Sequence, residues 1–187
     1  DSKDCTDNNL FFDVSSKLYD IEPSALSASK MGKMSISRKE FSQAIKYAQE
    51  AIDLETDDNK KAKYFLGLAD AYRNSSLFAK AREAAFKALE LKNNWGEAYM
   101  SLGNIYIAGA KSCGNEFEQK TIYWIAVDMF NIAKKDEDVS ERARKSINTY
   151  SKYFPSTEVC FFNNVEKNSE YLIECWVNRK TIARTSD

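Results

Sequence analysis

The sequence predicts a mainly α-helical protein, a right-handed α-α superhelix of stacked helical hairpins that ends in a small antiparallel β-meander. Three observations lead to this prediction. The 187 residues include only 2 Pro and 6 Gly, which favours long helices over many short strands. Small residues recur at regular intervals through the first three quarters of the chain. From residue 157 onward the apolar pattern changes from helical spacing to alternation.

Composition argues against several classes of function. The 27 Lys and Arg balance 28 Asp and Glu, so the chain has no excess of cations for nucleic-acid phosphates. No apolar run reaches the roughly 18 residues of a membrane span. The chain has no histidine, which removes Ser-His-Asp and Cys-His catalysis and every His-ligated metal site. We therefore expect a non-enzymatic protein that uses no metal and no cofactor.

An internal repeat organises residues 8–154. The segments AQEAIDLETD (48–57) and AFKALELKNN (85–94) each end a predicted helix in a polar turn. Ala44 and Ala51 in the first copy correspond to Ala81 and Ala88 in the second. This spacing fits a helical-hairpin repeat of about 34 residues with a short extension between the copies.

The pattern resembles the tetratricopeptide repeat, a helix–turn–helix family with fixed positions for large and small residues. One copy is filled by Phe65, Leu68, Ala69, Tyr72, Ala81 and Ala88. The next is filled by Tyr99, Leu102, Gly103, Tyr106, Ala126 and Ala133. The resemblance implies a helical domain over residues 1–155, with repeats near 25–57, 62–94 and 96–135 and a capping helix at 139–154.

Side-chain sizes and capping signals support these helices. A small residue such as Gly103 is expected where two helix backbones approach closely. Asn115 followed by Glu118 reads as a capping box that starts a helix near Glu116. Asp138 with Glu141 predicts a second box, which would open the last helix before Pro155.

The first predicted helix spans Leu10 to Asp20 and ends before Pro23. It resembles the second helix of a hairpin whose first helix is absent, so we expect the natural protein to extend further toward the N-terminus with more repeats. An ordinary solitary capping helix is the alternative interpretation.

Residues 156–187 are predicted to form a three-stranded meander that packs on the last helices. The strands are expected at 157–162, 171–177 and 181–185, from alternation and intervening polar turns. The run TIYWIAV (121–127) is apolar all round, as in a helix buried on several sides. Tyr123, Trp124 or Val127 is therefore expected to meet the meander.

The repeats, the long apolar helix and the ending CWVNRKTIART together resemble repeat proteins of Gram-negative bacterial envelopes. That resemblance implies a signal peptide in the precursor and a periplasmic or other extracytoplasmic location. The four cysteines show no CxxC spacing, so a zinc site is not expected. Cys160 and Cys175 could form a disulfide across the first two strands, with Cys113 nearby; four free thiols are the alternative.

The tetratricopeptide resemblance also implies a concave groove that binds a protein or peptide partner. Its candidate residues are Lys33, Lys63, Leu66, Asp70, Arg73, Asn74, Met100, Asn104 and Ile107. The carboxylate clamp of the chaperone-binding subfamily is absent, because Ser29, Lys33, Gly67, Glu97 and Ser101 occupy its positions. Two alternatives remain: these residues form a solvated polar face, or the chain is a structural C-terminal cap with binding done upstream. The sequence does not predict an oligomeric state.

Overall fold

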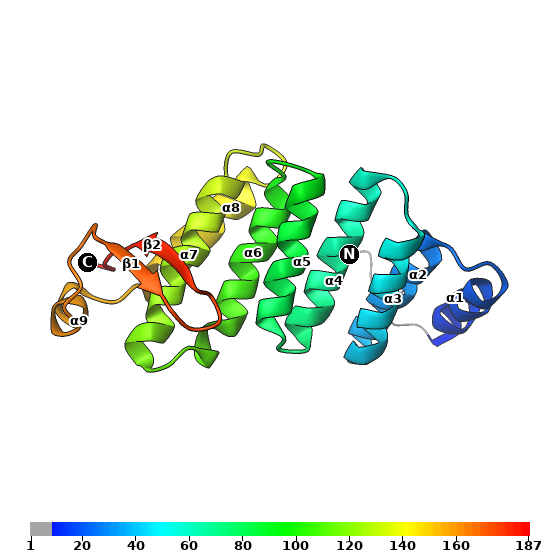
Figure 1. Ribbon diagram of the computed structural model, residues 1–187, viewed down its shortest axis with the longest axis horizontal. Coiled ribbons are helices and arrows are strands. Elements are labelled where there is room, and N and C mark those ends of the chain that lie inside the picture. The colour runs from blue at the N-terminus through cyan, green and yellow to red at the C-terminus, as the bar shows by residue number, and fades with distance from the viewer. Residues whose placement is uncertain (1–8) are drawn as a thin grey trace. The chain divides into compact units, whose positions relative to one another are not determined.

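The mainly α-helical fold with a small β element is confirmed. A computed structural model describes residues 9–187, with side chains from Asp13 onward, and this part of the chain holds nine α-helices and one two-stranded antiparallel sheet (Figure 1). The chain divides into two compact units, with the boundary between Asn93 and Asn94. This division differs from the predicted one at 155/156, because the C-terminal β element belongs to the second unit.

Two successive helical hairpins form most of the first unit. The first hairpin pairs α2 (Ala25–Ser37) with α3 (Phe41–Leu54), and the second pairs α4 (Asp58–Asn74) with α5 (Phe78–Leu91). Helix α4 also packs against α3 and contacts α2 (Figure 1). The unit is therefore a helical repeat in which the first helices of the two hairpins, α2 and α4, are neighbours.

Alanines at equivalent positions explain why the two hairpins repeat. Ala44 and Ala51 in α3 and Ala81 and Ala88 in α5 are all 0% exposed. A side chain that ends at Cβ lets the backbones of two helices approach closely enough to pack along their length. The predicted correspondence between the two copies thus appears as equal burial at equal positions.

The predicted first helix is confirmed as α1 (Asn9–Ile21), which packs against α2. The Tyr19 ring meets the Tyr47 ring of α3 edge-on, with 5.3 Å between centroids. Burial of Tyr19 and its hydrogen bond to Glu50 raise the pKa of Tyr19 to about 12. Val14 and Leu18 are both 57% exposed on this helix. The side chain of Leu10 lies outside the described residues.

The second unit is built around one buried helix, α7 (Glu116–Ala133). It packs between α6 (Gly96–Gly109) on one side and α8 (Ser140–Tyr150) on the other. Helix α7 starts where predicted: the Asn115 side chain accepts the Glu118 N–H (3.0 Å), and the Glu118 side chain accepts the Asn115 N–H (2.7 Å).

The second predicted capping box is wrong. Helix α8 has Val139 as its N-cap, which makes no side-chain cap. The nearby carboxylate that does accept backbone N–H groups is that of Asp136. It accepts the N–H of Asp138 (3.1 Å) and the N–H of Gly96 at the start of α6 (2.7 Å). Since Gly96 is 40 residues away in sequence, no local pattern marks this bond. After α8 a single 3-10 turn, η3 (Ser151–Tyr153), leads to buried Phe154.

The predicted first strand of the meander is also wrong. Residues TEVCFF form a short helix, α9 (Thr157–Phe162), whose N-terminus is capped by the Ser156 hydroxyl, which accepts the Val159 N–H at 3.3 Å. The sheet therefore has two strands, β1 (Glu170–Ile173) and β2 (Arg179–Ile182), with Tyr171 opposite Thr181. Among the described helices, none is long and apolar enough to cross a membrane.

Gly103 lies where α6 packs closely against α7. A Cβ placed on this residue would lie 2.3 Å from Cε1 of Phe130 in α7. By contrast, a Cβ on Gly67, in the middle of α4, would meet nothing within 4 Å. The two mid-helix glycines therefore have different structural roles.

Replacing these glycines should have opposite effects on the free energy of unfolding. Gly103→Leu should destabilise the protein by roughly 1–3 kcal/mol, because it overpacks the contact with Phe130. Gly67→Ala should stabilise it by about 0.5–1 kcal/mol, through helix propensity alone. Urea unfolding followed by circular dichroism measures both. Equal stability of the Gly103→Leu variant and the parent would contradict the predicted packing.

Candidate functional site

Six of the nine predicted groove residues lie on one face of the first unit. Lys33 comes from α2, and Lys63, Leu66, Asp70, Arg73 and Asn74 come from α4. Because α2 and α4 are in contact, their outward side chains form one surface, which we name the α2/α4 face. Lys33, Lys63 and Asn74 are exposed on it, and the other three are half-buried.

The polar side chains at the end of α4 bond within their own helix. The Arg73 guanidinium pairs with the Asp70 carboxylate across one helical turn. The Asn74 amide donates to the backbone carbonyl of Asp70 at 2.8 Å. These bonds fix the ends of the three side chains, and a partner that binds here would exchange them for its own groups or bind to them as they stand.

A shallow cleft separates α2 from α4. It is lined by Gly32, Ile36, Tyr64 and Gly67 among others, and its free volume of about 10 Å³ is about that of one water molecule. Tyr64 forms part of its wall. Burial raises the pKa of the Tyr64 hydroxyl, and the negative charge of the nearby Glu55 raises it further. This cleft is therefore too small to enclose a small-molecule ligand.

The remaining three predicted groove residues, Met100, Asn104 and Ile107, belong to α6 in the second unit. Met100 is only 7% exposed, so its side chain belongs to the packed interior. Asn104 and Ile107 are half-buried. The five predicted residues of α4, which we call the α4 cluster, thus lie on one face with Lys33. Met100 is buried and is not available to a partner.

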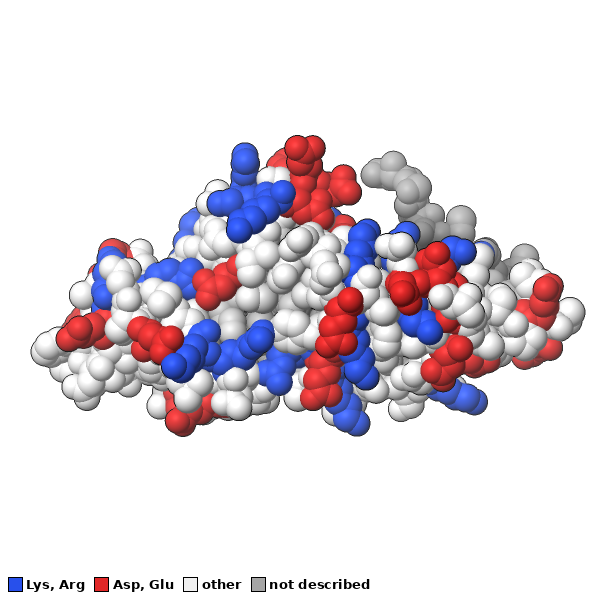
Figure 2. Space-filling view, turned by 45° about the horizontal axis from the view of Figure 1, so that its top comes forward, with Lys and Arg blue, Asp and Glu red and all other residues white. Residues whose placement is uncertain are grey.

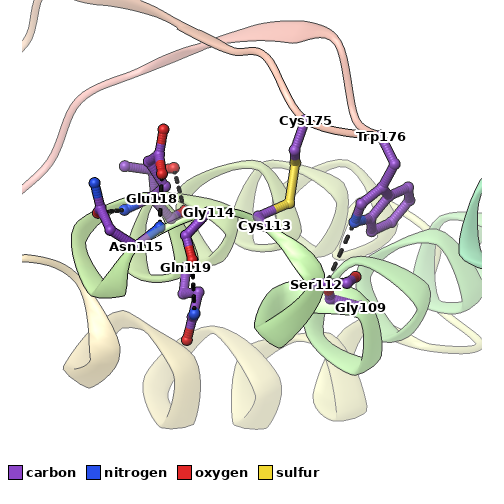
Figure 3. Close-up of a disulfide and its surroundings, with 10 residues drawn as sticks. Gly109, Ser112, Cys113, Gly114, Asn115, Glu118, Gln119, Cys175 and Trp176 are labelled. Atoms are coloured by element: carbon purple, nitrogen blue, oxygen red, sulfur yellow. Dashed lines mark hydrogen bonds between the residues drawn. A yellow bond between two sulfur atoms is a disulfide. The ribbon is translucent and has the colours of Figure 1, made fainter.

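The cysteine pairing differs from the prediction. Cys113 forms the disulfide with Cys175 (Figure 3), with 5.5 Å between their Cα atoms. Cys160 is a buried free thiol. Cys160 lies on α9 rather than on a strand opposite Cys175, which removes the geometry that the predicted pairing required. Cys5 lies outside the described residues.

The disulfide links the turn between β1 and β2 to the turn after α6. Beside it, the Trp176 indole donates to the Gly109 carbonyl at 3.3 Å (Figure 3), and the Trp176 ring stacks on Tyr106 with 5.7 Å between centroids. These two contacts hold the same segment of the hairpin as the covalent bond. The hairpin is thereby fixed at its turn.

The other end of the hairpin is fixed on α7. The Trp124 indole donates to the Arg184 carbonyl (2.7 Å), and the Arg184 guanidinium donates back to the Trp124 carbonyl (2.6 Å). Arg184 also pairs with Asp128, whose carboxylate accepts the Thr181 hydroxyl at 2.5 Å. The predicted contact through Trp124 is confirmed. Tyr123 instead stacks on Tyr150 and Tyr153.

On the face of the described residues that Figure 2 shows, charge gives no sign of a polyanion site. In the face that Figure 2 shows, Lys and Arg side chains are interspersed with Asp and Glu side chains. Within residues 9–187, no cluster of three or more His, Cys, Asp or Glu side chains is arranged to hold a metal ion.

No protein-family model matches the chain, and no curated protein is similar enough to count as a relative.

Tryptic mapping without reductant should recover residues 112–120 covalently linked to residues 168–179, because these two peptides carry the bonded cysteines. The bond closes a loop between residues 62 apart in sequence, so the Cys113→Ser/Cys175→Ser variant should lose roughly 4 kcal/mol of unfolding free energy. Residues 153–167, which contain Cys160, should appear unlinked. A linkage between that peptide and residues 168–179 would contradict the structure.

Proposed function

We propose that the protein is a non-enzymatic interaction module of the tetratricopeptide type, which holds an extended segment of a protein partner on the α2/α4 face. The observation that supports this proposal best is the repetition of the hairpin α2–α3 by α4–α5. That repetition sets the first helices of two hairpins side by side, the arrangement through which such repeats present a continuous binding surface.

The chemistry of the α2/α4 face suits a peptide. Leu66 offers apolar area, and the open space over Gly67 lets a partner backbone approach α4. Asp70 and Arg73 present opposite charges, and they retain 44% and 33% side-chain exposure. Such a surface can pair donors and acceptors of an extended chain.

The disulfide supports an extracytoplasmic location, as proposed from the resemblance to envelope proteins. Disulfides persist in oxidising compartments and are rare in the cytosol. In this setting the module would hold a partner within an envelope assembly. Alkylation of cells before lysis, followed by mapping of Cys113, tests this. A Cys113 that carries the alkyl group was a free thiol in the cell, and that result would contradict the proposed location.

A second candidate function is a structural cap, with partner binding done by another part of the protein. It is favoured by the bonds that Asp70, Arg73 and Asn74 make among themselves, which leave these groups satisfied without a partner. Under this alternative, deleting residues 157–187 should lower the melting temperature while leaving affinity for the partner unchanged.

Charge reversal on the α2/α4 face should weaken partner binding. For a partner identified by pull-down from envelope extract, Asp70→Lys and Arg73→Glu should each lower affinity by about tenfold, because attraction is replaced by repulsion. Titration calorimetry measures the affinity, and circular dichroism checks that helical content is unchanged.

Two variants on α5 serve as matched controls. Glu83→Lys and Lys87→Glu make the same charge changes on exposed residues that lie on the second helix of the hairpin. They should bind the partner as the parent does. Unaltered binding by both α4 variants would count against the α2/α4 face.

A further inference from the structure

Strand β1 has an open edge. Within the described residues β1 pairs only with β2. In an antiparallel pair, alternate residues direct their N–H and C=O groups away from the neighbouring strand. The outer edge of β1 therefore carries backbone donors and acceptors that another extended chain could bind.

A cavity of about 360 Å³ follows this edge. Its walls are formed by five consecutive residues, 171–175, together with Cys113, Glu118 and Thr121. Consecutive residues of β1 line it, and no residue of β2 does, which fits a space along the outer edge of the strand. An added strand could place a side chain in this space.

One wall of the cavity is held rigidly. The Tyr171 ring packs edge-on against Phe117 and Trp124 of α7, with centroid distances of 5.9 Å and 5.5 Å. Both cysteines of the Cys113–Cys175 disulfide also line the cavity. The site is therefore preorganised, which lowers the entropy cost of binding an extended segment.

Two carboxylates give the cavity a negative charge. Glu118 lies at the start of α7 and lines the cavity, and its Oε2 accepts the Asn115 N–H at 2.7 Å (Figure 3). Glu174 also lines the cavity, and both glutamates are exposed. Burial, and after it the charges of Glu118 and Glu174, raise the pKa of Tyr171, which places both carboxylates near this ring. In the part of the chain that the structure describes, neither forms an ion pair.

We propose that the outer edge of β1 binds an extended segment of a partner protein as an added strand, with one Lys or Arg side chain of that segment in the cavity between Glu118 and Glu174. The backbone bonds give affinity, and the two carboxylates select a basic side chain. This surface is separate from the α2/α4 face and does not depend on the function proposed for that face.

Three blocked pentapeptides test the proposal on the full chain labelled with ¹⁵N. The first is acetyl-Thr-Val-Lys-Val-Thr-amide, the second has Glu in place of Lys, and the third keeps Lys but is N-methylated at all three central residues, so that strand bonds are lost in either register. The first should shift the amide resonances of Leu172 and Glu174 in a saturable way. The other two should bind at least about tenfold more weakly, because one loses the charge attraction and the other loses the strand bonds.

A charge reversal with a matched control completes the test. Glu174→Lys should weaken binding of the lysine peptide by about tenfold, whereas Glu166→Lys, which changes a glutamate outside the cavity, should leave it unchanged. The absence of saturable shifts at β1 up to millimolar peptide would overturn the proposal. So would equal binding of the N-methylated peptide, or shifts at β1 that depend on protein concentration alone and reveal pairing between copies of the chain.

Discussion

Close approach of helix backbones at small side chains is the constraint on which the structure depends. In the first unit, Ala44 and Ala81 are fully buried at equivalent points of two hairpins. In the second, the ring of Phe130 occupies the space where Gly103 has no side chain. Larger residues at these points would separate the helices and leave the apolar contacts of each hairpin incomplete. The exposed faces follow from this packing, because it determines which side of each helix remains outside.

Long-range polar contacts then fix the parts that helix packing leaves free. Asp136 satisfies the first N–H of α6, and Arg184 exchanges backbone bonds with Trp124 while pairing with Asp128. A hairpin of two four-residue strands is too small to be stable alone. Its anchors on α7 and the disulfide to Cys113 make it a rigid part of the second unit, and this rigidity keeps the β1 edge in a defined shape.

Local patterns predicted the helices well because the signals are short in range. The small residues of the two hairpins and the capping box at Asn115 and Glu118 each lie within one or two helical turns. The sequence was misleading where the decisive partner is distant. TEVCFF reads as a strand by composition, but Ser156 caps it as a helix, and residues 9–187 offer no further strand to pair with it.

The candidate sites show the same division. The residues of the α4 cluster could be assigned to one surface because helical spacing alone places them together. The Cys113–Cys175 pairing could not, since it depends on where α9 and the hairpin fold back. The cavity beside β1 combines residues from three segments. Glu118 and Glu174 are far apart in sequence, so no local pattern predicts that they line the same cavity.

Hydrogen exchange of the partner-bound protein, followed by mass spectrometry, tests the central claim most directly. Helix packing that turns α2 and α4 outward as one binding surface predicts slower exchange over residues 25–37 and 58–74 when the partner is bound. Unchanged exchange in those two segments, with protection over α3 and α5 instead, would contradict the account.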